Sequence, residues 1–236
     1  MSTEGEYRPD PRLVATRTRE GDWLLNVSPV AMSDGRELRW YPPQPVAFAL
    51  MEAKRYQDRG VEERQAIMSA LARRADAAWA PGDPTQTLNC ISDLHIAVLY
   101  AFTAIESLAN HSIDQLDDDA TVEVENRKGE LVELSKSDMV RRLGISEKLT
   151  RVVPMLDDGV NIKGTRPWER YRHLKELRDE LVHVKERGYS PDPQVLTAYD
   201  RLLLGEGDDC VGDAVAVVVG ARPAFLPDFV LEPLAP

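Results

Sequence analysis

The sequence predicts a mainly α-helical protein with one or two small β hairpins. Apolar residues recur at three- and four-residue steps through most of the chain after residue 46, which is the period of an amphipathic helix. Two short stretches instead alternate apolar and polar residues around a glycine-containing turn, which is typical of a hairpin. The length of 236 residues is enough for one substantial hydrophobic core.

The N-terminal part mixes a tail, a hairpin and a helix. The first 20 residues are charged and lack a sustained period, so we expect a loose tail. Strands at 23–27 and 37–41, joined by the turn Ser33-Asp34-Gly35, predict a hairpin that ends at Pro42. A helical period then runs over 46–79 and stops at the Pro-Gly turn that follows.

The middle of the chain predicts a central helix and an inserted hairpin. Residues 88–113 are apolar on most sides, so we expect this helix to lie at the centre of the core. Alternation over 121–125 and 130–134, on either side of a turn that ends in Gly129, predicts a second hairpin.

Helical patterns resume after this hairpin. Thr165 is a plausible cap for the longest of these helices, and Pro167 fits its first turn. The predicted helices lie at 137–143, 146–156, 166–187 and 193–204, and an apolar segment of uncertain structure lies at 211–219. We divide the chain into an N-terminal tail and hairpin (1–50), a helical domain (51–205) with a hairpin insertion near 120–135, and a C-terminal extension (206–236).

Composition limits the class of protein. The chain is 43% hydrophobic and 29% charged, and its start has no apolar segment of the kind that directs export. Cys90 and Cys210 make neither a disulfide framework nor a cysteine-type zinc site. We therefore expect a cytoplasmic protein with reduced thiols, no membrane contact, no metal and no cofactor.

The net charge of −11 argues against a general nucleic-acid binder, because neutralising phosphates requires lysine and arginine. The charge is unevenly distributed. Residues 136–190 contain 13 Lys and Arg against 9 Asp and Glu, while the rest of the chain contains 16 against 31. These basic residues either form a surface that faces RNA or are ordinary surface charge with local ion pairs.

Arg178 and His183 lie in this basic part, on the predicted helix 166–187. An imidazole moves protons near neutral pH, and a fixed cation stabilises charge on a phosphate. At about 100° per residue the two side chains diverge by about 140°, so one helix does not bring them together. Asp179 and His183 share a face, where the carboxylate can orient the imidazole. The alternative is a structural histidine and an arginine paired with a nearby acid.

The segment Tyr171-Arg172-His173-Leu174-Lys175-Glu176-Leu177-Arg178-Asp179-Glu180-Leu181-Val182-His183 resembles the signature helix of the HEPN superfamily, whose motif is Arg-x4–6-His, often with Asn after the Arg. Residues 101–110 are similar to an earlier helix of many members, and Trp168 with Leu174 and Leu177 matches a common lead-in. The resemblance covers roughly residues 88–187.

The resemblance implies an up-and-down bundle of four or five helices that forms a homodimer, with two motif helices facing across a cleft. It implies a metal-independent endoribonuclease of a toxin–antitoxin or antiviral defence system, with an antitoxin or defence protein as a further partner. His183 would transfer protons during attack by the 2′-hydroxyl, Arg178 would hold the phosphate, and a 2′,3′-cyclic phosphate would form. Some members lack activity and bind a nucleotide, an RNA or a protein instead. A helical structural protein without a site is a third possibility.

Further residues are candidates for the same site. Asp179 departs from the frequent Asn, and it either weakens phosphate binding or orients His183. Glu106 and Asn110, one turn apart on the central helix, either line the cleft with Arg178 or form a structural polar pair. Substrate-binding candidates beside the motif are Arg170, Arg172 and Lys175, within a wider basic set of Arg141, Arg142, Lys148, Arg151, Lys163 and Arg166.

Overall fold

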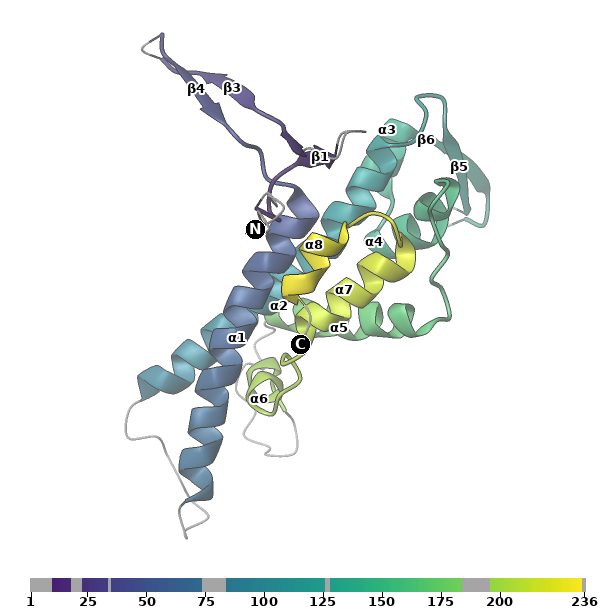
Figure 1. Cartoon of the computed structure of the whole chain (residues 1–236). Helices are drawn as coiled ribbons and strands as arrows, with labels where there is room; N and C mark the ends of the chain where they lie inside the picture. Colours follow the sequence, from purple (N-terminus) through teal and green to yellow (C-terminus); the bar gives the residue numbers. More distant parts are fainter. Residues whose placement is uncertain are drawn as a thin grey trace, which may run out of the picture.

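The computed structural model describes residues 10–17, 23–33, 35–73, 84–125, 128–183 and 196–234. The described chain is mainly helical, with antiparallel two-stranded ladders at its margins (Figure 1). The helices are α1 (Pro45–Ala72), α2 (Pro84–Asp114), α3 (Lys136–Arg142), α4 (Ile145–Glu147), α5 (Arg166–Val182), α6 (Ala198–Leu203), α7 (Cys210–Ala221) and α8 (Asp228–Leu231). The strands are β1 (Ala15–Arg17), β2 (Trp23–Leu25), β3 (Ser28–Ala31), β4 (Glu37–Trp40), β5 (Thr121–Glu125) and β6 (Leu131–Ser135).

The two long helices α1 and α2 lie side by side and run in opposite directions (Figure 1). Tyr56 stacks on Tyr100, and further along α1 the carbonyl of Gly60 accepts a hydrogen bond from the Cys90 thiol. The backbones approach closely at Gly60, where an added Cβ would lie 2.7 Å from the Leu94 side chain. This glycine therefore sets the distance between the two helices.

Helix α7 packs against α1, α2 and α5, and α5 also packs against α2. Pro167 at the start of α5 faces Gly220 near the end of α7, while Arg170 pairs with Asp213 about two turns earlier on α7. Helices α5 and α7 are therefore antiparallel.

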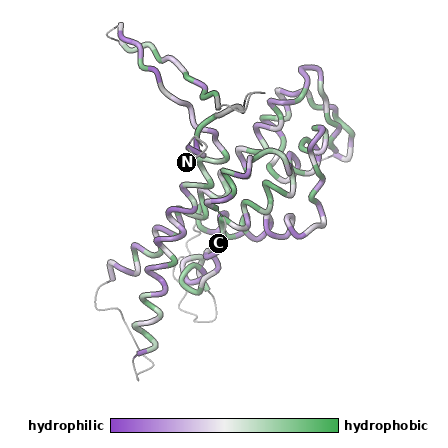
Figure 2. The backbone as a smooth tube through the Cα atoms, in the orientation of Figure 1, coloured by the Kyte–Doolittle hydropathy of each residue, from purple (hydrophilic) through white to green (hydrophobic). Residues whose placement is uncertain are grey.

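The main hydrophobic core surrounds α2. This helix buries residues along most of its length, and α7 contributes an apolar face that appears green at the centre of Figure 2. By length and composition α2 could cross a membrane, but half of its most apolar window is buried in the protein. Core helices of soluble proteins have the same composition, so the feature is weak support for a membrane span.

A smaller layer adjoins the end of α2. The β5–β6 hairpin pairs Thr121 with Ser135 and packs with α3 on a second apolar cluster that includes Leu134 and Met139. Lys136 donates hydrogen bonds to the carbonyls of Asp114 and Leu116, which closes the C-terminal end of α2. The predicted second hairpin and the predicted helices at 88–113 and 137–143 are confirmed.

The N-terminal hairpin differs from its prediction. The turn at Ser33 and Gly35 is in place, but it joins β3 to β4, whereas β2 pairs with β1. Part of the tail that we expected to be loose is thus a strand. The turn could be predicted because Gly35 has a φ of 81°, a backbone conformation that favours glycine. The pairing of β2 with β1 in the tail leaves no comparable signal in the sequence.

Several helix predictions need adjustment. The predicted helix 146–156 consists of α4, a π-helical turn (Lys148–Val152) and a 3-10 turn (Val153–Met155). The predicted helix 166–187 ends at Val182, and 184–187 lie outside the described residues, as do 74–79 of the first predicted helix and 193–195 of a later one. The uncertain segment 211–219 is α7. Helix α7 contributes Val211, Val217 and Val218 to the main core.

Candidate functional site

Helix α5 holds the Arg178 and His183 pair. Its buried stripe of Tyr171, Leu174, Leu177 and Leu181 packs against α2 and α7. Thr165 stands at the predicted cap position, although its hydroxyl donates to the Ile162 carbonyl rather than accepting from α5. The helix ends at Val182, so His183 is its C-cap residue.

Arg178 is held by two different contacts. Its guanidinium carbon lies 4.2 Å from the centre of the Phe102 ring on α2, and its Nη1 donates to Asp179 Oδ1 at 2.6 Å. The side chain is 24% exposed. A cation over an aromatic face and beside a carboxylate is fixed in position while one edge stays accessible.

Asp179 binds cations rather than His183. Its carboxylate accepts from Lys175 Nζ at 2.5 Å as well as from Arg178. Partial burial acts to raise the pKa of Asp179, but the two cations outweigh it and lower that pKa below its ordinary value. Among the described residues, Asp179 meets His183 only through the backbone, where its carbonyl accepts the His183 N–H at 2.9 Å.

The expectation that Asp179 orients His183 is therefore not supported by the described contacts. The i, i+4 relation requires regular helix at both positions, whereas His183 has φ −106° and ψ 54°. Its side chain is exposed, and the described part of the protein gives its ring no hydrogen bond or ion pair. The imidazole at the end of α5 is thus accessible to solvent.

Glu106 and Asn110 continue along α2 from Phe102, at four-residue steps on one face. Arg178 lies at the Phe102 end of this row. At the other end Asn110 Oδ1 accepts from Lys148 Nζ at 2.8 Å. The described contacts therefore connect Arg178 and Asn110 to opposite ends of one helix face rather than to each other.

Lys148 is a buried residue that the sequence placed on a possible RNA-facing surface. It begins the π-helical turn, is 6% exposed, and also donates to the Val140 carbonyl. Burial lowers the pKa of Lys148, and the nearby Glu106 carboxylate partly offsets this effect. The sequence did not indicate this burial, because lysine is rarely buried without a partner.

The predicted substrate-binding residues all have carboxylate partners. Arg170 pairs with Asp213 at 2.6 Å and Asp209 at 3.4 Å, and Lys175 pairs with Asp179. Arg172 pairs with Glu169 at 3.2 Å. The basic surface beside α5 is consequently closer to neutral than its arginine content indicates, since acidic side chains from α5 and α7 lie among the cations.

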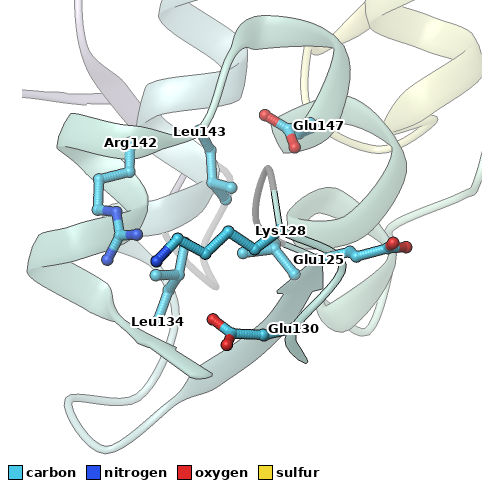
Figure 3. Close-up of a pocket in the computed structure, with 8 residues that line it drawn as sticks. Glu125, Lys128, Glu130, Leu134, Arg142, Leu143 and Glu147 are labelled. Carbon is cyan, nitrogen blue, oxygen red and sulfur yellow. The ribbon is translucent and has the colours of Figure 1, made fainter. Parts of the chain in front are cut away.

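An open hollow of about 570 Å³ lies elsewhere, between the β5–β6 hairpin, α3 and α4 (Figure 3). Its floor is apolar, and its rim carries cations such as Arg142 and carboxylates such as Glu130 and Glu147. The lining residues are Val124, Glu125, Lys128, Glu130, Leu134, Arg142, Leu143 and Glu147. None comes from α5, so this hollow is separate from Arg178 and His183.

Comparisons with known proteins identify no relative: no family model, no curated protein and no solved structure matches the chain.

Proposed function

We propose that the chain is a metal-independent endoribonuclease of HEPN type. In this proposal α1, α2, α5 and α7 form the up-and-down helical bundle of that superfamily, and α5 is its motif helix. The observation that carries the proposal is the geometry of α5: Arg178 is fixed against Phe102 at the packed end of the motif, and His183 is exposed at the helix terminus.

The chemistry follows from these two side chains. The 2′-hydroxyl oxygen of the RNA attacks the adjacent phosphorus, His183 accepts the proton, and the bond to the 5′-oxygen breaks. That oxygen takes up a proton, which leaves a 2′,3′-cyclic phosphate and a 5′-hydroxyl. Arg178 neutralises the charge that develops on the phosphoryl oxygens. Two proton-transfer groups are needed, and a homodimer supplies a second His183 across its two-fold axis.

On the HEPN resemblance we propose that the chain acts in the cytoplasm as a toxin or phage-defence effector, with an antitoxin or defence protein as its partner. The acidic remainder of the chain would repel bulk RNA and confine binding to the motif helix.

A second candidate function is a catalytically inactive HEPN-like module that binds a nucleotide, an RNA or a protein. The ion pair between Arg178 and Asp179 favours it, because a carboxylate that already neutralises the guanidinium competes with a phosphate for the same donor. The two candidates differ in whether RNA is cut, not in the fold.

The decisive test is RNA cleavage by purified protein in EDTA. We expect wild-type protein to cut RNA and His183→Ala to lose cleavage by at least about a hundredfold, the usual loss when a general acid or base is removed. His173→Ala is the matched control, since His173 lies on the same helix and is also exposed. Equal cleavage by His183→Ala and wild type would refute the proposal, and intact RNA with both would favour the inactive module.

A further inference from the structure

The N-terminal arm, residues 23–33 and 35–41, projects away from the helices (Figure 1). It exposes apolar side chains. Val30 is 45% exposed, Met32 43% and Leu38 52%. Its β3–β4 ladder has only two strands. A lone two-stranded hairpin is marginally stable in water, whereas three or more strands with an apolar face are stable.

The hydrogen-bonding pattern shows which backbone groups face outwards. Met32 N–H donates to the Arg36 carbonyl, and Val30 is paired with Leu38. Hydrogen-bonded pairs alternate with non-bonded pairs in an antiparallel ladder. Pro29 and Ala31 on β3 and Glu37 and Arg39 on β4 are therefore at the positions whose backbone groups point away from the ladder.

The two outer edges differ in how well they can pair with another strand. Pro29 has no N–H, so the outer edge of β3 offers a donor at Ala31 but none at Pro29. On β4, Glu37 and Arg39 each present an N–H and a carbonyl. In the part of the chain that the structure describes, no strand pairs with this edge of β4.

We propose that the outer edge of β4 pairs with β4 of a second copy of this chain, antiparallel and centred on Leu38. A two-fold axis at Leu38 places Glu37 opposite Arg39 of the second copy, and Arg39 opposite its Glu37. Both are outward-facing residues, so each of these two pairs exchanges two backbone hydrogen bonds. The result is a four-stranded sheet with Leu38 beside its counterpart on the apolar face.

The charges favour a second copy over another partner. Opposite charges directly across a ladder are stabilising and like charges are destabilising. A carboxylate and a guanidinium placed symmetrically about Leu38 are complementary to their own sequence in antiparallel register. Within a single chain these two groups form an ion pair, with Arg39 Nε 2.7 Å from Glu37 Oε1, and both side chains are more than half exposed. Because Pro29 removes one of the two outward-facing N–H donors of β3, pairing at that edge is disfavoured and the assembly closes as a dimer rather than growing into a fibre.

Charge reversal tests the register. Glu37→Arg and Arg39→Glu each place like charges opposite one another, so we expect each variant to raise the dimer dissociation constant at least about tenfold in sedimentation equilibrium. An equimolar mixture of the two variants should form a heterodimer, and the double variant Glu37→Arg/Arg39→Glu should dimerise like wild type. Glu62→Arg, the same reversal at an exposed position on α1, is the matched control.

Amide hydrogen exchange provides an independent readout. Glu37 and Arg39 amides should become protected as wild-type concentration rises, while Leu38, whose amide faces β3, stays protected throughout. A wild-type monomer at all concentrations would overturn the proposal. An association state that Glu37→Arg leaves unchanged from wild type, or a double variant that associates no better than Glu37→Arg, would also overturn it. The pairing does not depend on ribonuclease activity, and an intact dimer in Glu37→Arg would leave the ribonuclease proposal untouched.

Discussion

Arg178 has two neighbours that act in opposite ways on a phosphate ligand. The Phe102 ring orients the guanidinium without consuming its hydrogen-bond donors, whereas Asp179 occupies one donor and neutralises the charge. Lys175 is neutralised by the same carboxylate. Asp179 therefore controls how much positive charge this part of α5 offers to RNA.

Replacing Asp179 by Asn should strengthen RNA binding. The change keeps the shape of the side chain, removes one negative charge and releases both Arg178 and Lys175. We expect the dissociation constant for a short RNA to fall by about fivefold, equivalent to the roughly 1 kcal/mol of a good exposed ion pair. Fluorescence anisotropy at fixed salt measures this. Glu176→Gln removes an exposed carboxylate of the same helix as a control, and an equal gain from both variants would exclude a specific role for Asp179.

The sequence was enough to select Arg178, Asp179 and His183 as candidates, but it did not predict their contacts. The spacing of Arg178, Asp179 and His183 was readable, but the partners of Asp179 depend on where α5 ends, and helix ends are weakly encoded. The position of Phe102 under Arg178 follows from the packing of α2 against α5. Contacts between residues far apart in the sequence leave no local signal.

Helices α5 and α7 are joined by an ion pair that is partly buried. Arg170 is 26% and Asp213 16% exposed at the side chain, and His173 lies 3.7 Å from the same carboxylate. Burial raises the pKa of Asp213, while Arg170 and His173 act in the opposite direction and Asp209 adds to the increase. Removing Arg170 leaves this carboxylate without its strongest partner.

Arg170→Ala should lower the free energy of unfolding by about 1–3 kcal/mol at about pH 7. Because the pKa of Asp213 is raised, this carboxylate takes up its proton at a higher pH in the folded state than in the unfolded state. Acidification therefore removes the cost of burying its charge. The destabilisation should therefore shrink between about pH 7 and about pH 4 in urea unfolding. A loss that grows as the pH falls would contradict this assignment. Arg172→Ala, whose ion pair is exposed, should change stability little at either pH.

The crossing of α1 and α2 should not tolerate a methyl group at Gly60. Alanine favours helix over glycine by about 1 kcal/mol, but its Cβ would lie 2.7 Å from the buried Leu94 side chain. Overpacking costs about 1–3 kcal/mol, so we expect Gly60→Ala to be destabilising overall. Urea unfolding measures this.

A double variant identifies the cause of that loss. Leu94→Ala alone should cost about 2–5 kcal/mol, because it leaves a cavity. If the clash with Leu94 is the cause, Gly60→Ala/Leu94→Ala should cost clearly less than the sum of the single variants. Strict additivity would show that Gly60 acts through something other than this contact.

Strongly periodic elements were predictable, and pairing partners were not. The apolar face of α2 and the β5–β6 hairpin follow from local patterns, and the structure has both. The segment 211–219 was ambiguous because an apolar run of that length suits a strand or a buried helix. Packing against α2 and α5 decides in favour of α7. The β1–β2 pairing was missed because each strand has three residues, which is too short for a clear alternation of apolar and polar side chains.

Two surfaces of the chain are proposed to contact a second copy. Helix α5 would contact it to complete the ribonuclease site, and β4 would pair with it through its open edge. Two different two-fold contacts on one chain give a closed tetramer or an open chain, whereas either contact alone gives a dimer. The mass of wild type and of Glu37→Arg in solution therefore also shows whether a second contact exists.

The most direct test of the proposed ribonuclease is the identity of the RNA ends produced in EDTA. We expect wild-type protein to yield fragments with a 2′,3′-cyclic phosphate and a 5′-hydroxyl, resolved by mass spectrometry. We expect His183→Ala to yield none, while His173→Ala resembles wild type. Fragments with a 5′-phosphate, or undiminished cleavage by His183→Ala, would contradict it.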